Sequence, residues 1–122
     1  MAFKVSDIIS DARSDLKDSY EGSYTYFQAD MARYAGEAVV ALRQVRSSTR
    51  YDPVTEELYD DDGSWLALTE DQINLAIPVE DKYRPSLAAY IIYKCMMRDV
   101  TDEGNKSVAE DAYNRFAQIA AQ

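Results

Sequence analysis

The chain has no histidine, only one cysteine and no long apolar run. Without histidine, neither a Ser-His-Asp nor a Cys-His catalytic set can form, and a single cysteine cannot make an intramolecular disulfide. No glycine-rich phosphate loop, CxxC pattern or HExxH pattern occurs. We therefore expect no enzymatic activity and no cofactor. Cys95 lies among apolar residues, so we expect it to be a small core residue.

The sequence also lacks any stretch close to the roughly eighteen apolar residues that span a bilayer. Its first ten residues contain no apolar block of the kind that marks a secretory signal. We expect a protein that is made in the cytosol and has no membrane span.

The chain also has few basic residues. The chain has 13 basic and 22 acidic side chains, which gives a formal net charge of -9. Such a charge repels phosphate backbones, so sequence-specific DNA binding is not expected. The charge can serve solubility alone, or it can form a wall along which DNA slides without being held. The length of 122 residues suits one domain with one modest core.

Apolar residues recur at helical spacing in four long segments, so the predicted fold class is mainly α, a four-helix bundle. The predicted helices span residues 5–18, 26–46, 85–100 and 106–120. Ser6 is expected to cap the first helix, with Asp7 favourable in its first turn. The second helix should be the longest, with an apolar stripe over 27–45 and with Arg43 and Arg46 near the negative end of its dipole.

The two C-terminal helices are the clearest part of the pattern. Pro85 can occupy the first turn of the third helix, where its missing N–H costs nothing. The predicted buried stripe of that helix is Leu87, Ile91 and Cys95. After a polar break that contains Gly104, the fourth helix presents a predicted buried face of Val108, Ala112, Phe116 and Ile119. Two helices joined by so short a loop should pack antiparallel.

Residues 47–76 carry turn residues, acidic clusters and short apolar groups, and they form an insertion between the second and third long helices. The Asp-Gly pair at 62–63 is flanked by aromatic and aliphatic residues, which predicts a β-hairpin with strands at 57–59 and 65–68. The alternative is an extended acidic loop that becomes ordered only against a neighbouring subunit. Further along, Thr69 and Gln72 have the spacing of a capping box.

Five acidic residues gather in this insertion: Glu56, Glu57, Asp60, Asp61 and Asp62. Hard cations such as calcium bind several carboxylate oxygens. An EF-hand loop that started at Asp60 would lack the glycine at its sixth position and the glutamate at its twelfth. We therefore expect no metal site and interpret the cluster as an acidic loop surface or as part of an acidic channel wall.

Aromatic residues and arginines in and beside the insertion are candidates for contacts with another subunit or a partner. Tyr and Trp supply large contact areas at interfaces, and a basic edge on one subunit can meet an acidic edge on the next. The candidate contact residues are Arg46, Arg50, Tyr51, Tyr59, Trp65 and Leu66.

The stretch over 77–119 contains an aliphatic-Pro pair, a Tyr-Arg step, a helix rich in Ala and Tyr, and a last helix of the AxxxYxxF type. This arrangement resembles the small head-to-tail adaptor (connector) proteins of tailed bacteriophages. The matching residues are Ile77, Pro78, Asp81, Tyr83, Leu87, Tyr90, Tyr93, Asp99, Ala109, Tyr113 and Phe116. The segment 23–46 is similar to the second helix of that family, with Tyr26 and Asp30 at its aromatic and acidic positions. The resemblance weakens over residues 47–76.

The resemblance implies an adaptor-type bundle and a structural protein of the virion at the head-tail interface, assembled in the host cytoplasm. It implies a homo-oligomeric ring, a dodecamer in such adaptors, that sits below the portal protein and docks a tail or nozzle protein. DNA would pass through the ring without specific binding, and the insertion would reach a neighbouring subunit, the portal or the tail protein. The alternative is a small acidic helical regulator or inhibitor that binds a single protein partner.

Overall fold

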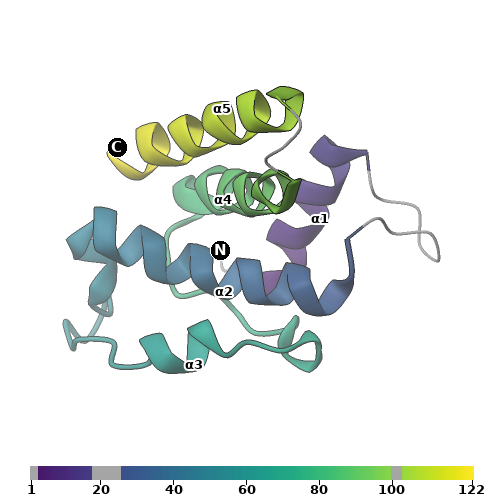
Figure 1. Ribbon diagram of the computed structural model, residues 1–122. Helices are drawn as coiled ribbons and strands as arrows, with labels where there is room; N and C mark the ends of the chain where they lie inside the picture. Colours follow the sequence, from purple (N-terminus) through teal and green to yellow (C-terminus); the bar gives the residue numbers. More distant parts are fainter. Residues whose placement is uncertain (1–2, 18–25, 100–102) are drawn as a thin grey trace.

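The computed structural model describes residues 3–17, 26–99 and 103–122 (Figure 1). The described part of the chain is mainly helical, which confirms the predicted class. Its α-helices are α1 (Val5–Leu16), α2 (Gln28–Val45), α3 (Asp62–Leu66), α4 (Arg84–Met96) and α5 (Glu103–Ala120). The four long helices begin and end within a few residues of the predicted bounds. The predicted ends at residues 18 and 100 lie outside the described residues.

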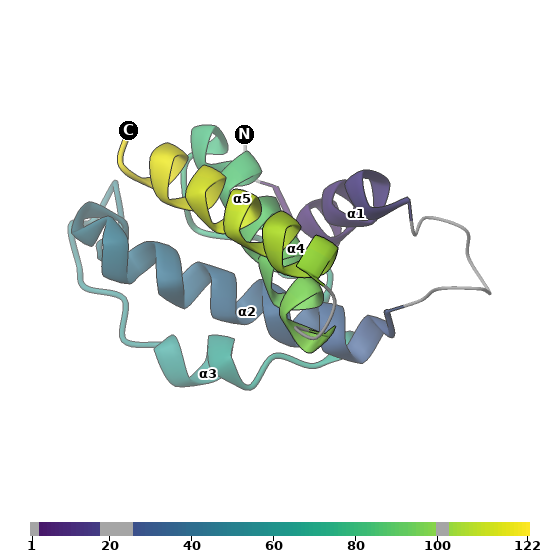
Figure 2. The ribbon, with the colours of Figure 1, turned by 45° about the horizontal axis from the view of Figure 1, so that its top comes forward.

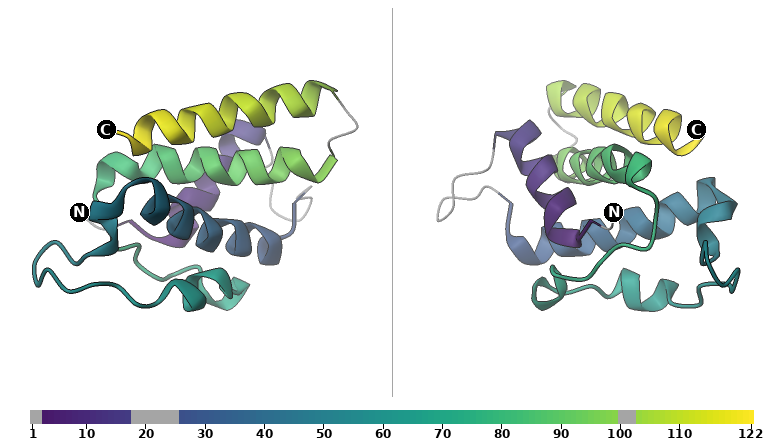
Figure 3. Two further views of the ribbon diagram at one scale, coloured as in Figure 1. Left: turned by 60° about the vertical axis from the view of Figure 1, so that its left-hand side comes forward. Right: turned by 180° about the vertical axis from the view of Figure 1, so that it is seen from behind.

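The helices stack in the order α5, α4, α2 and α3, with α1 packed against α4 and α2 (Figures 1 and 2). Helix α4 lies at the centre of this stack and contacts α1, α2 and α5. Helices α4 and α5 run antiparallel along most of their lengths, as the short break predicted (Figure 3). The molecule is therefore a helical bundle, with α3 and the rest of the insertion covering the outer side of α2.

Helix α4 is buried on several faces because neighbours surround it. Pro85 lies in its first turn, as predicted. The predicted stripe of Leu87, Ile91 and Cys95 is buried, which confirms it. The Cys95 Sγ lies 3.5 Å from the Met31 Sδ in the core. One polar group is buried as well: the Ser86 hydroxyl donates a hydrogen bond of 2.9 Å to the Phe116 carbonyl and so joins α4 to α5.

The buried face of α5 differs from the predicted one at its first and last positions. At the last position Ile119 is half-buried, and Ala120 is buried in its place. Ala112 and Phe116 are buried as predicted, but Val108 is 44% exposed and Ala109 is buried in its place. Ala109, Ala112 and Ala120 have small side chains, so the surface of α5 that meets α4 is shallow and the two helices can lie close together. The periodicity alone favoured the larger Val108, because it takes no account of the space between the helices.

The apolar stripe predicted for α2 is correct in the middle of the helix and wrong at its ends. The buried residues include Met31, Tyr34, Ala35, Ala38, Val39 and Leu42. Phe27 at the N-cap is 70% exposed and Val45 in the last turn is 48% exposed. Both residues lie beyond the neighbours that cover the centre of α2, so helical spacing continues there without burial.

The first turn of α1 is held by the end of the insertion. Its N-cap is Lys4 and not the predicted Ser6, and the Lys4 N–H donates to the Asp7 carboxylate at 2.8 Å. The Val5 N–H donates to the Leu75 carbonyl at 3.0 Å, and the Ser6 N–H donates to the Ile73 carbonyl at 2.7 Å. The N–H groups of a first helical turn have no partner within the helix, so backbone from the insertion replaces the side-chain cap that we expected from Ser6.

The predicted β-hairpin is wrong. Residues 62–66 form α3, and the only β-bridges among the described residues are isolated pairs, Tyr51 with Leu58 and Lys4 with Ala76. The helix begins because Asp62 is favourable in its first turn and the Trp65 N–H donates to the Asp61 carbonyl. The capping box of Thr69 and Gln72 is present, which confirms that prediction.

Gly36 on α2 allows the insertion to approach the bundle. A Cβ atom at this position would lie 1.9 Å from the Trp65 carbonyl oxygen and 3.1 Å from the Leu68 Cβ. No side chain fits in that space, so the backbone of α3 passes directly over Gly36. Gly63 in α3 differs, because a Cβ there would have no neighbour within 4 Å.

These two glycines form a matched pair for a stability test. We expect Gly36→Ala to lower the free energy of unfolding by about 1–3 kcal/mol, because α3 must move away from α2. We expect Gly63→Ala to leave stability unchanged or to raise it by up to about 1 kcal/mol, because alanine is the better helix former. Urea unfolding followed by circular dichroism measures both. Equal effects of the two substitutions would contradict the close approach at Gly36.

Candidate interaction surface

A buried arginine on α2 holds the root of the insertion. The Arg43 side chain is fully buried, and its Nη1 lies 2.6 Å from the Asp61 Oδ1 and 2.8 Å from the Asp62 Oδ1. The Tyr59 ring covers the guanidinium, with its centroid 4.8 Å from the Arg43 Cζ. Burial raises the pKa of Tyr59, so this phenol stays neutral. We name the set of Arg43, Tyr59, Asp61 and Asp62 the anchor.

The anchor extends to two more residues of the insertion. The Trp65 Nε1 donates to the Asp61 Oδ2 at 3.0 Å, and the indole is buried against the bundle. The Arg50 Nη2 lies 3.5 Å from the Asp62 Oδ2. Each aspartate of the anchor therefore binds Arg43 and a second residue. The Nε and Nη2 of Arg43 are buried and make no hydrogen bond within the described part of the chain, so the cation depends on these two carboxylates.

Residues 51–60, which include Tyr59 of the anchor, form a loop that we name the arm. Its turn is closed by the Asp52 side chain, whose Oδ1 accepts hydrogen bonds from the N–H groups of Val54 at 2.7 Å and Thr55 at 2.9 Å. The backbone adds two bonds between Asp52 and residues 56–57, and Glu56 takes a positive φ of 60° to complete the turn. The hydrogen bonds from Thr55 and Val54 lower the pKa of Asp52, so its carboxylate keeps the turn closed at neutral pH.

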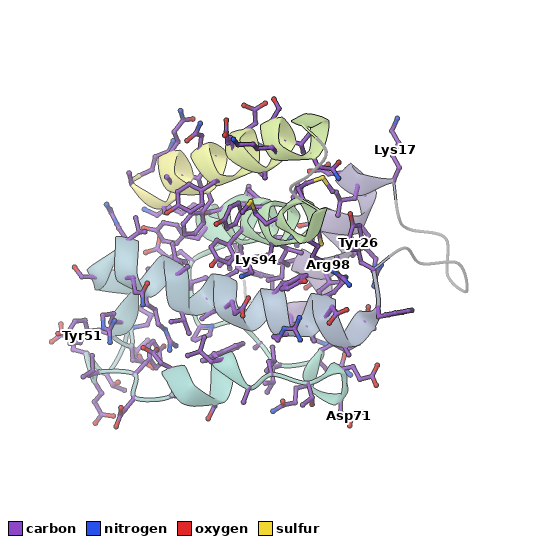
Figure 4. The ribbon with its side chains drawn as sticks, in the orientation of Figure 1. Lys17, Tyr26, Tyr51, Asp71, Lys94 and Arg98 are labelled. Carbon is purple, nitrogen blue, oxygen red and sulfur yellow. The ribbon has the colours of Figure 1, made fainter. Side chains whose placement is uncertain are left out.

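The arm exposes apolar side chains. Val54 is 87% exposed, Leu58 is 55% exposed and Tyr51 is 49% exposed. The arm extends past the C-terminal end of α2, and Tyr51 lies at that end of the molecule (Figures 3 and 4). An ordered turn that presents a nearly free valine has apolar surface available to another molecule.

The structure separates the predicted contact residues into two groups. Tyr51 and Leu66 are exposed, whereas Tyr59 is half-buried and Trp65 is buried. Arg46 is the C-cap residue of α2, and its Nη1 donates to the Ala121 carbonyl at 3.1 Å, which joins the end of α2 to the C-terminal end of α5. Arg50 is half-buried beside Asp62.

The residues of the predicted acidic surface also fall into an exposed group and a half-buried group. Glu56, Glu57 and Asp60 are exposed, whereas Asp61 and Asp62 are half-buried and engaged by Arg43. The exposed acids therefore belong to the arm. The two aspartates that bind Arg43 have a structural role in holding the insertion.

Sequence reasoning did not assign Val54, Leu58 or the role of Arg43. Asp52-Pro53 is a turn signal, because Asp at the first position and Pro at the second favour a β-turn, and that signal points to a loop tip at Val54. The binding of Arg43 to Asp61 has no local signal, since the two residues are 18 positions apart on different elements.

A second hollow surface lies at the opposite end of the bundle. An open groove with a volume of about 770 Å³ is lined by Tyr93 from α4, by Met97 just after α4, and by Ala109 and Tyr113 from α5. Its aromatic wall continues inward, because the Tyr93 and Tyr113 ring centroids lie 5.0 Å apart and Tyr90 meets Phe116 edge-to-face at 5.1 Å. Burial raises the pKa of Tyr90 to about 12.

Neither a metal centre nor a membrane span is found in the described residues. No three His, Cys, Asp or Glu side chains among them are grouped so that they could hold an ion. None of the described helices is both long and apolar enough to cross a bilayer. Comparison with known proteins found no matching family model, no matching curated protein and no matching solved structure.

The anchor predicts that removing its two carboxylates lowers the unfolding free energy more than removing its arginine does. We expect the double variant Asp61→Asn/Asp62→Asn to lose about 3 kcal/mol of unfolding free energy, because it leaves a buried cation without a counter-charge. We expect Arg43→Met to lose less, about 1–2 kcal/mol, because water can reach the side chains of Asp61 and Asp62, which are 43% and 32% exposed. Urea unfolding measures both, and Asp60→Asn on the exposed arm serves as the control. A larger loss for Arg43→Met would contradict the anchor.

The raised pKa of Tyr90 predicts a dependence on alkaline pH. The neutral phenol contributes stability that is fully present below pH 10 and is lost as the pH rises through about 12, because the folded state holds the proton more tightly than the unfolded state. We expect Tyr90→Phe to make the fall of unfolding free energy in this range shallower by up to about 1.4 kcal/mol per pH unit. The half-exposed Tyr51→Phe is the control, and equal slopes for the two variants would contradict the burial effect.

Proposed function

We propose that this chain is a head-to-tail adaptor of a tailed bacteriophage, a structural protein that forms a ring below the portal, extends the DNA channel and docks the tail. The observation that carries the proposal is the division of the chain into two parts. A helical body buries five of the residues that resemble the adaptor family, and an ordered arm exposes apolar side chains that another molecule could cover.

The resembling residues support this proposal by the positions that they occupy. Ile77, Tyr83, Leu87, Ala109 and Phe116 are all buried where α4, α5 and the segment before α4 meet. These five residues therefore contribute to the packing of the bundle around α4. This use suits a scaffold protein, because packing residues stabilise the fold.

The charge supports a role as a channel wall. Each copy has a formal net charge of -9, and the arm contributes four acidic side chains and no basic ones. Acidic surface repels the phosphate backbone, so DNA could move past a ring of such subunits without being held. The contact between two neighbouring copies can be modest, because a closed ring joins many contacts through effective concentration.

The proposal is tested by mixing the purified chain with the portal protein encoded in the same genome. We expect many copies of the chain to bind each portal ring as one further ring, because each subunit position of the portal offers the same site. Native mass spectrometry gives the number of copies, and electron microscopy gives their arrangement. A portal ring from an unrelated phage is the control.

Two outcomes would contradict the adaptor. The chain could fail to bind its own portal, or it could form a complex of one or two copies with a single protein. The second outcome would instead indicate the acidic regulator that the charge alone also permits.

A further inference from the structure

Two apolar surfaces of this chain are not covered within one copy. The arm carries Val54 and Leu58 in solvent, and the groove between α4 and α5 exposes Met97 and Tyr113, each 42% accessible. Both features are apolar and both are open. The arm lies at the end of the bundle that also holds the C-terminus (Figure 1). The groove is lined by residues from the first part of α5, such as Lys106 and Ala109, and α5 begins at the other end of the bundle (Figure 1). The arm of one copy therefore cannot fill its own groove.

We propose that the arm of one copy inserts Val54 and Leu58 into the α4–α5 groove of a second copy. The inference rests on the proposed function in that it names the contact from which the ring is built. A contact that joins opposite ends of the same molecule is heterologous, so each copy offers one arm and one groove, and repetition yields a ring when the rotation closes.

The charges of the two surfaces are complementary. The arm carries Asp52, Glu56, Glu57 and Asp60 and no basic residue. The groove has Lys106 and Glu110 on its lining, and the hollow that adjoins it at Met97 is lined by Arg33, Lys94 and Arg98. Asp30 and Glu37 pair with these cations. The two linings together contain four basic side chains, Arg33, Lys94, Arg98 and Lys106, and two acidic ones, Glu37 and Glu110, although the whole chain is strongly acidic, so these hollows suit an acidic partner.

The arm is also prepared for insertion. Its turn is closed by the Asp52 side chain and by backbone hydrogen bonds, and its root is fixed by the anchor. A loop that already has its bound shape loses little conformational entropy on binding, which raises the affinity that a small apolar contact can reach. A second copy is favoured over an unrelated partner because the chain supplies both complementary surfaces.

Directional disulfide formation between two variants tests the contact. Val54→Cys is mixed with a mass-tagged Asn114→Cys chain, since Asn114 lines the groove and is exposed. Under mild oxidation we expect the mixed dimer to exceed either homodimer by about tenfold, because only the arm-to-groove contact brings these two thiols together. The native Cys95 is buried and provides the unsubstituted control. Val54→Cys mixed with Leu75→Cys, at an exposed site away from both surfaces, provides the positional control.

Self-association gives an independent measurement. We expect Val54→Asp to weaken it by about tenfold or more, because a buried valine side chain contributes that much to an interface. Val54→Ile should retain association, and Leu75→Asp controls for the added charge. Val54 is 87% exposed, so thermal melting should be the same for all three Val54 forms and a folding defect would be visible. Sedimentation velocity over a concentration series measures the association.

The proposal is overturned if the mixed dimer is no more abundant than the homodimers or the Leu75→Cys control, or if Val54→Asp associates as the native chain does. These results are independent of the portal. A chain that binds its portal as a ring without arm-to-groove disulfides would keep the adaptor function and remove this contact. A chain that forms the disulfides but does not bind the portal would keep this contact and remove the adaptor function.

Discussion

The guanidinium of Arg43 lies inside the protein, where a cation is stable only beside negative charge. Asp61 and Asp62 supply that charge from the insertion, and the Tyr59 ring covers the group. Because all three come from four consecutive positions, satisfying the arginine fixes the path of the chain at the point where the arm ends and α3 begins. Trp65 then lies against the bundle, and its backbone crosses α2 at the one position that has no side chain, Gly36.

The anchor also explains why the arm stays exposed. The chain is tied at Arg50 and at residues 59–62, so the segment between these ties can make a turn but cannot lie back over the bundle. Within that turn, the Asp52 carboxylate accepts hydrogen bonds from the N–H groups of Val54 and Thr55. The Val54 side chain then lies in solvent. Val54 is therefore exposed because of hydrogen bonds that hold the turn closed, and this persistent exposure is what makes it a candidate for binding.

Periodicity predicted the long helices well because the residues with which they meet their neighbours recur at helical spacing. It failed where the neighbour ends, at Phe27 and Val45, because spacing carries no information about the length of the adjoining helix. The turn signal of Asp62-Gly63, a pair typical of hairpins, failed because Asp62 binds Arg43 and begins a helix instead. The predicted contact residues could not be sorted into buried and exposed ones from the sequence. Whether Trp65 or Val54 points to solvent depends on contacts between distant residues.

The anchor and the proposed contact between copies are linked by geometry. In a heterologous assembly, the angle between two neighbouring copies is repeated at every contact, so a small error accumulates and produces an open filament in place of a ring. That angle depends on the direction in which the arm leaves the bundle, and the direction depends on the ion pairs at its root. A surface salt bridge would hold the root weakly, because water and salt screen it. Placing the cation of the pair out of reach of solvent gives the arm one direction, so a buried charge that adds little net stability can still specify the curvature of an assembly.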